Sequence, residues 1–176
     1  MEAFDQVLGA ARLGEGWAFE RLFHWLGRPV AGYLRGAGVE DPDGLANEVF
    51  LKAFRGLDGF DGDADRFRSW LFTIAHHAVI DDRRRRARRP KTAALERDVP
   101  APDEVDVVLG DDRVRGLLAG LAPDQRDVVL LRLVADLSIE ETAAALGKKP
   151  NAVKQLQHRA VVALRKRLAS EEAVTP

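Results

Sequence analysis

The chain has 176 residues and a formal net charge of −1. Its hydrophobic content of 46% is enough for the cores of one or two small folded domains and excludes a disordered tail. The absence of cysteine excludes a disulfide scaffold and any thiolate metal site, and it fits a reducing cytoplasm. No apolar run approaches the roughly 20 residues that cross a bilayer, and the acidic N-terminus is unlike a secretory signal, so the sequence predicts a cytoplasmic protein without membrane insertion.

The first helices are indicated by apolar residues at helical spacing. Residues 2–12 show this pattern, and so do residues 16–36, where we expect Pro29 to kink or split the helix. A third helix is predicted over residues 43–57, because turn-forming residues precede it and an apolar stripe runs along it. No segment alternates with period two, so the chain is predicted to be all-α.

A loop rich in glycine and aspartate follows at residues 58–66, and a fourth helix begins near Phe67 and continues into a run of arginines. Six of the seven residues in the segment 83–89 are arginines. A solvated basic patch is the plain interpretation, but phosphate is the natural partner of so many guanidinium groups at a helix end. In the free protein we expect Asp81, Asp82 and an acidic linker to balance this charge.

That acidic linker is predicted at residues 91–112, which combine prolines with a run of aspartates and glutamates and few large apolar residues. It separates two predicted small helical domains, at residues 1–90 and 113–170. Two basic blocks, at residues 83–92 and 113–168, flank an acidic block at residues 93–112. This charge pattern indicates what kind of partner the chain binds and not how the chain folds.

The second domain is predicted to contain four helices. A short one follows Val114, and the next starts near Pro123. Ser138 and Glu141 form a predicted capping box at the start of a third, which Gly147 ends. The stripes expected to face inward comprise, in the second helix, Leu130, Leu133, Val134 and Leu137, and in the last helix Val153, Leu156, Ala160, Val161, Leu164 and Leu168.

The last two helices and the turn between them have the pattern of a helix-turn-helix. From Lys148 to Leu168 the chain has no acidic residue, whereas basic and amide side chains face outward near the start of the second helix. A solvated basic helix is the alternative interpretation. Taken as a recognition helix, it offers these candidates for the DNA major groove: Lys148, Lys149, Lys154, Gln155, His158 and Arg159.

Two long stretches resemble the extracytoplasmic-function sigma factors of bacterial RNA polymerase, within the sigma-70 family. "DGLANEVFLKAFRGLDGF" and "FRSWLFTIAHHAVIDDRRRRARR" are similar to the second domain of that family. "LAPDQRDVVLLRLVADLSIEETAAALGKKPNAVKQLQHRAVVALRKRL" is similar to its fourth domain. The resemblance implies an alternative sigma factor that binds core RNA polymerase, through the clamp helices of the largest subunit and the flap, and directs it to promoter DNA.

The resemblance also implies roles for particular residues. The fourth-domain helix would read the −35 element. Candidates for the −10 element are Phe60, Asp63, His76, His77, Arg83, Arg84 and Arg86, and candidates for the clamp-helix contact are Asp43, Asn47, Glu48, Leu51 and Arg55. His77 stands where the family has an asparagine that reads a base, so the −10 preference is expected to differ. An anti-sigma factor is a possible further partner by analogy.

No catalytic motif, metal site or cofactor site is indicated, so an enzyme is not expected. His76 and His77 are adjacent and therefore point in different directions on a helix, which is unsuited to a shared zinc ion. Two other functions remain open from the residues alone. One is a two-domain helix-turn-helix repressor or activator that acts without core polymerase, and the other is an RNA- or ribosome-associated helical protein.

Overall fold

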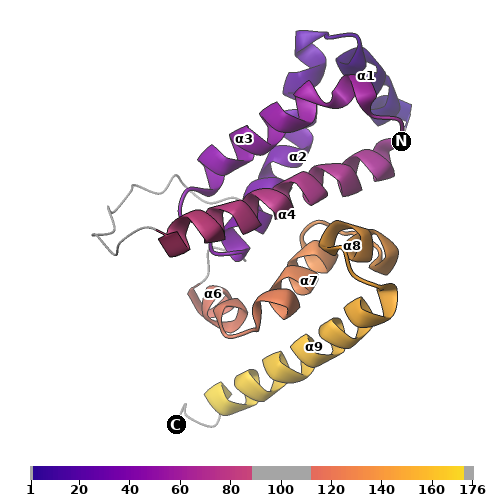
Figure 1. The fold of residues 1–176 in the computed structure, drawn as a ribbon. Coiled ribbons are helices and arrows are strands. Elements are labelled where there is room, and N and C mark those ends of the chain that lie inside the picture. Colours follow the sequence, from indigo (N-terminus) through magenta and orange to yellow (C-terminus); the bar gives the residue numbers. More distant parts are fainter. Residues whose placement is uncertain (1, 89–111, 173–176) are drawn as a thin grey trace.

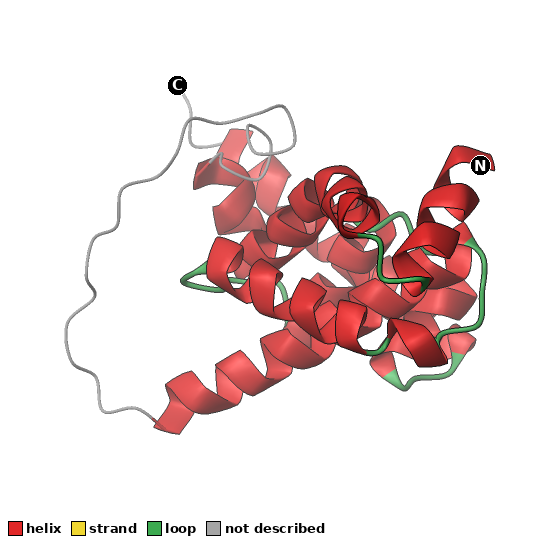
Figure 2. Ribbon diagram, turned by 90° about the horizontal axis from the view of Figure 1, so that it is seen from above, coloured by secondary structure: helices red, strands yellow, loops and turns green. Residues whose placement is uncertain are grey.

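The computed structural model describes residues 2–88 and 112–172, and over these residues it contains helices and no strand (Figures 1 and 2). The all-α prediction is confirmed. The first group of helices comprises α1 (Glu2–Arg12), α2 (Gly16–Gly36), α3 (Pro42–Arg55), the short 3₁₀ helix η1 (Leu57–Gly59) and α4 (Ala64–Arg88). The second comprises α6 (Asp112–Ala119), α7 (Pro123–Leu133), α8 (Ile139–Leu146) and α9 (Pro150–Glu172). The predicted linker lies outside the described residues, except for Asp112, where α6 begins.

In the first group, α2 packs between α1 and α3, and α4 closes the bundle. Its interior is aromatic, with Tyr33, Phe50, Phe67 and Phe72 among the largest fully buried side chains. The split considered at Pro29 does not occur, because α2 is one continuous helix from Gly16 to Gly36. A proline inside a helix removes one backbone hydrogen bond, and the burial of α2 against its neighbours outweighs that loss.

The second group contains the predicted helix-turn-helix. The Ser138 side chain accepts a hydrogen bond from the Glu141 backbone N–H at 3.1 Å, and the Glu141 carboxylate accepts one from the Ser138 N–H at 2.7 Å. Gly147 ends α8 with a left-handed φ of 61°, which glycine adopts without steric cost. These local signals were therefore interpreted correctly.

The two groups pack directly on each other (Figure 1). Helix α4 lies against α8, and the end of α2 lies against α7, so one buried apolar cluster runs through both groups. At Gly36 the two groups approach so closely that an added Cβ atom would lie 2.5 Å from Leu130 Cδ2. Arg68 on α4 also donates a hydrogen bond to the carbonyl of Ala135 at 2.7 Å.

This packing corrects the inward stripes predicted for α7 and α9. Consecutive residues of α7 from Asp127 to Leu131 are buried, because one face of the helix contacts α8 and α9 while the other contacts the first group. Leu133, predicted to face inward, is 78% exposed at the end of α7, and Val161 on α9 is 37% exposed. A single 3.6-residue stripe describes a helix buried on one face and fails for a helix buried on two.

Candidate nucleic-acid and polymerase interfaces

The predicted −35 candidates lie on the outward face of α9 and in the turn before it. Helix α9 is anchored by Val153 and Ala160, which are both fully buried. The candidates on the opposite side of α9 are exposed, namely Lys154, Gln155, His158 and Arg159, and so is Lys149 in the turn. Lys148 is half-buried, and its ammonium group contacts the Asp124 carboxylate at 2.8 Å. The structure thus gathers all six side chains on one helix-turn-helix, five of them exposed to solvent.

The predicted −10 loop lies between η1 and the start of α4. Phe60 is half-buried and stacks on Trp70, with ring centroids 4.9 Å apart. Asp63 caps α4 by accepting a hydrogen bond from the Arg66 N–H at 3.0 Å. Phe60 therefore supports the loop from inside, and the carboxylate of Asp63 already has a structural task.

The arginines at the end of α4 differ in their surroundings. Arg84 lies 3.6 Å from Asp81, and Arg86 lies 2.8 Å from Asp82. Arg84 is exposed and Arg86 is half-buried, so the two predicted DNA contacts are unequally accessible. These ion pairs agree with the expectation that Asp81 and Asp82 balance part of the charge.

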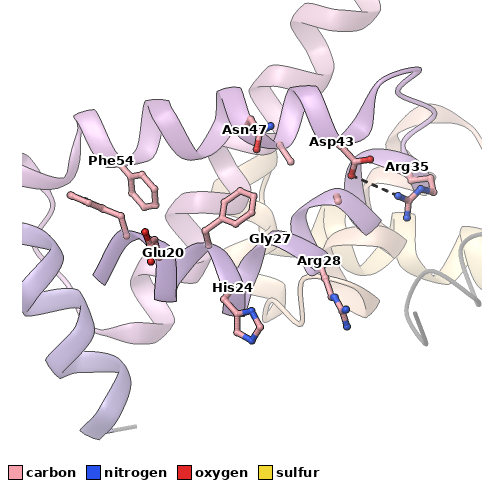
Figure 3. A pocket seen from close by; sticks show the side chains of 12 residues that line it. Glu20, His24, Gly27, Arg28, Arg35, Asp43, Asn47 and Phe54 are labelled. Atoms are coloured by element: carbon pink, nitrogen blue, oxygen red, sulfur yellow. Dashed lines mark ion pairs between the residues drawn. The ribbon is translucent and has the colours of Figure 1, made fainter. Parts of the chain in front are cut away.

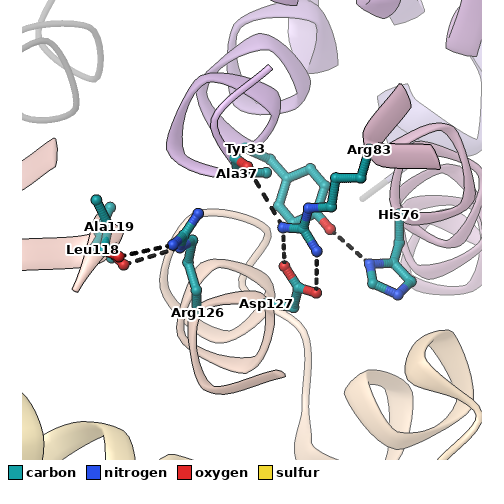
Figure 4. Close-up of polar contacts among 8 residues, drawn as sticks. All are labelled: Tyr33, Ala37, His76, Arg83, Leu118, Ala119, Arg126 and Asp127. Carbon is teal, nitrogen blue, oxygen red and sulfur yellow. Dashed lines mark hydrogen bonds and ion pairs between the residues drawn. The ribbon is translucent and has the colours of Figure 1, made fainter. Parts of the chain in front are cut away.

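Arg83 has a partner that the sequence analysis did not identify. Its guanidinium group donates two hydrogen bonds to the Asp127 carboxylate on α7, at 3.0 and 2.8 Å (Figure 4). A third contact, at 3.5 Å, reaches the carbonyl of Ala37. The Asp127 side chain is only 4% exposed, whereas that of Arg83 is 28% exposed. We call this bidentate pair the interdomain clasp, because it joins the end of α4 to the helix-turn-helix group.

The clasp adds a third acidic partner, Asp127, to Asp81 and Asp82, and the linker that was expected to balance the arginines lies outside the described residues. The hydrogen bonds that Arg83 donates to Asp127 raise the pKa of Arg83, so the guanidinium group keeps its charge at neutral pH. The signal in the sequence was a lone acid inside the apolar run "RDVVLLRLV". A buried carboxylate requires a partner, but the sequence does not show that the partner lies 44 residues earlier.

His76 lies beside the clasp and not on the surface (Figure 4). Its Nδ1 shares a 3.0 Å hydrogen bond with the Tyr33 hydroxyl, and only 6% of the residue is exposed. Burial lowers the pKa of His76, an effect that the nearby Asp127 carboxylate partly opposes. Burial also raises the pKa of Tyr33 well above its usual value. The structure therefore corrects the expected surface position of His76, whereas His77 is exposed.

The candidates for polymerase contact lie on the exposed side of α3. A groove of about 650 Å³ runs between α2 and α3, lined by aromatic side chains, with Asp43 and Asn47 on its α3 side (Figure 3). Leu51 is 55% exposed. Glu48 lines a second hollow, between α3 and α4, and Arg55 is exposed. All five candidates are accessible to a partner protein.

Within residues 2–88 and 112–172, no cluster of three or more potential metal-ligating side chains occurs. In the same part of the chain, no helix is both long and apolar enough to cross a membrane.

The comparisons with known proteins agree with this architecture. The model of sigma-70 region 2 matches residues 21–89, and the model of sigma-70 region 4 matches residues 111–164. The chain is 32% identical to the ECF RNA polymerase sigma factor BldN of Streptomyces coelicolor, over 94% of this chain and 66% of that protein. It is 33% identical to the RNA polymerase sigma factor NccH of Alcaligenes xylosoxydans xylosoxydans, over 96% of each protein.

Among solved structures, CnrH in complex with the cytosolic domain of CnrY superimposes with a TM-score of 0.72 and 27% identity, over 95% of this chain and 98% of that one. Two helical units, of which the second contains a helix-turn-helix, define the class of DNA-binding proteins that act in transcription. The chain belongs to the sigma-70 family and, within it, to the extracytoplasmic-function sigma factors.

Proposed function

We propose that the chain binds core RNA polymerase and directs it to a specific set of promoters. The observation that carries this proposal is the presence of both sigma regions in one chain, with an exposed polar face on the helix that would read DNA. In this proposal the protein acts in the cytoplasm and catalyses no reaction of its own. Its contribution is to position polymerase by recognising sequence.

The −35 element would be read by α9. Gln155 and Arg159 lie on its exposed face, four residues apart and therefore about one turn from each other. An amide suits adenine and a guanidinium group suits guanine in the major groove. Lys148 and Lys149, at the start of the helix-turn-helix turn, would contact phosphates and so position the helix without specifying sequence.

The −10 element would be engaged by the loop 58–66 and the arginines of α4. In this proposal the closed arrangement is the polymerase-free form, because the N–H groups that Arg83 directs to Asp127 are then not available to a phosphate. Length leads to the same inference. Elements about 25 base pairs apart lie ~85 Å apart along a duplex, whereas a chain of 176 residues packed as one body is only about 40 Å across. The two helical groups would therefore separate when both elements are bound.

Core polymerase would bind the α2–α3 side of the first group. The groove there offers an apolar floor, and the exposed Leu51 adds apolar surface that a partner protein would cover. Because a solved structure with this fold holds the sigma factor RpoE in complex with the anti-sigma factor NepR from Bartonella quintana, we also propose that an anti-sigma factor binds this chain in the absence of polymerase.

The test is transcription in vitro. Purified chain would be added to core RNA polymerase with fragmented genomic DNA of the source organism, and the 5′ ends of the transcripts would be mapped. We expect new start sites that share an upstream motif. Binding to duplex DNA without any effect on polymerase would instead indicate a repressor or activator and would contradict the proposal.

A matched pair of variants tests the polymerase surface. Leu51→Asp places a charge on the exposed face of α3 and should weaken core binding at least tenfold in a competition assay. Leu133→Asp changes an even more exposed leucine, on α7, and serves as the control for an added surface charge. Equal core affinity of the two variants would show that α3 is not the contact.

A further inference from the structure

Arg12, the last residue of α1, reaches the proposed −10 loop from a distant part of the sequence. Its Nη2 donates a hydrogen bond to the carbonyl of Gly62 at 2.9 Å, across a separation of 50 residues. Its guanidinium carbon also lies 5.5 Å from the centroid of the Phe60 ring. One side chain therefore holds both the backbone and the aromatic residue of the loop.

The remainder of the loop is tightly constrained. The Phe60 N–H donates to the carbonyl of Leu57 at 3.0 Å, and the Phe60 ring contacts Trp70 and Phe67. An added Cβ atom at Gly62 would lie 2.7 Å from Phe60 Cζ and 2.8 Å from Arg66 Cβ. The loop thus has one close-packed conformation, in which the carbonyl of Gly62 is directed to Arg12.

Charge provides a second reason for a cation at this position. Asp58, Asp61 and Asp63 are exposed on the loop. Three carboxylates on a surface that approaches DNA oppose binding unless positive charge lies beside them. The guanidinium group of Arg12 is buried enough that its Nε has no contact with solvent, so its charge acts beneath the loop and not on DNA directly.

We propose that Arg12 is a positioning residue for promoter recognition: it fixes the loop 58–66 in the conformation that captures an unstacked base of the −10 element. A base extruded from a duplex is selected by a pre-formed site, because a loop that must order itself on binding loses both affinity and discrimination. Arg12 does not touch the base and acts through Gly62 and Phe60. This inference rests on the proposed function, which makes the loop a base-capturing element.

The experiment uses polymerase reconstituted with the full chain and a promoter library randomised across the −10 element. Open complexes would be selected and sequenced, so that the preference for the best over the worst base is measured at each position. Arg12→Gln should lower that preference about tenfold at the positions nearest the loop, while core affinity changes by less than twofold. This is the effect expected when one charge-assisted hydrogen bond no longer fixes the site.

Arg21→Gln is the matched control, because Arg21 also lies over an aromatic ring in the same helical group, 5.4 Å from the centroid of Trp25, but makes no contact with the loop. It should keep the wild-type base preference. If both variants lose base preference in proportion to the fall in their melting temperatures, Arg12 has only a general structural role and the inference is wrong.

Gly62→Ala supplies a second test that leaves Arg12 in place. The added methyl group displaces Phe60 or Arg66, so the variant should lose base preference as Arg12→Gln does, and the double variant should lose no more than either single one. If Arg12→Gln does not fold, unchanged preference in Gly62→Ala overturns the inference. If the wild type initiates at specific promoters and Arg12→Gln keeps the normal base preference, this inference alone is overturned. If the wild type does not initiate at specific promoters, the proposed function is overturned.

Discussion

The interdomain clasp leads to a prediction about the shape of the free protein. Asp127→Asn keeps the volume of the side chain but removes the charge that holds Arg83. The variant should shift the free protein towards a form in which the α7 group has separated from α4. The packing of Leu130 against Gly36 remains in the variant, so only the electrostatic part of the contact is tested.

The magnitude follows from burial. Removing one partner of a fully buried ion pair costs about 3–5 kcal/mol, whereas exposed pairs contribute about 0–1 kcal/mol. Asp127 is 4% exposed and Arg83 28% exposed, which places this pair between the two limits. We therefore expect a loss of about 2 kcal/mol, equivalent to a roughly thirtyfold rise in the ratio of open to closed molecules.

The chain has no cysteine, so two can be introduced for fluorescent labels without competing sites. Asp5 on α1 and Arg165 on α9 are exposed and belong to different helical groups. Single-molecule energy transfer between labels at these positions reports the open fraction. Addition of core polymerase to the wild type should produce the same low-transfer population.

Asp124→Asn is the matched control. Asp124 lies on the same helix, but it is exposed and pairs with Lys148 within its own group. This control should leave the open fraction unchanged. If Asp127→Asn opens the protein no more than Asp124→Asn does, the clasp does not hold the groups together, and the argument from burial is refuted.

Two further predictions concern DNA reading and pH. Arg159→Ala and Gln155→Ala should each cost about 1–3 kcal/mol of binding free energy at one position of the −35 element. Lys148→Ala should instead weaken binding to all sequences alike and reduce the salt dependence of binding by about one ion. Equal, sequence-independent losses of affinity in all three variants would place the base-reading face elsewhere. Because burial lowers the pKa of His76, the unfolded chain binds a proton as the pH falls through about 6.5 while the folded chain does not. Stability should therefore decrease by up to about 1.4 kcal/mol per pH unit from there down to the folded-state pKa of His76. In urea titrations, His76→Gln should lose this slope and His77→Gln should keep it; an identical slope in both variants would contradict the burial argument.

The local features of this fold were accessible from the sequence because each depends on residues a few positions apart. Ser138, Glu141 and Gly147 define the start and end of α8 through contacts within one or two turns. The spacing of apolar residues was sufficient to establish the all-α class. The exposed face of α9 followed from the same spacing, since Val153 and Ala160 are the buried side of a helix that carries its polar residues opposite.

Prediction from the sequence failed for helices that are buried on more than one face and for residues whose partner is distant in the sequence. The split considered at Pro29 is overridden by the burial of α2, and Leu133 was assigned to a stripe that α7, buried on two faces, does not have. His76 was a candidate for contact with the −10 element, but it is buried and hydrogen-bonded to Tyr33, 43 residues earlier in the sequence.

The sequence by itself therefore determined the helices, the helix-turn-helix and the family, because hydrophobic spacing, caps and turn residues act over short distances. Only the tertiary structure decided that Arg83 is held by Asp127 and that Arg12 is held by Gly62. Charged side chains on separate helices have no spacing rule that identifies their partners. Their pairing is set by how the helices pack, and that packing depends on the apolar surfaces of the whole chain.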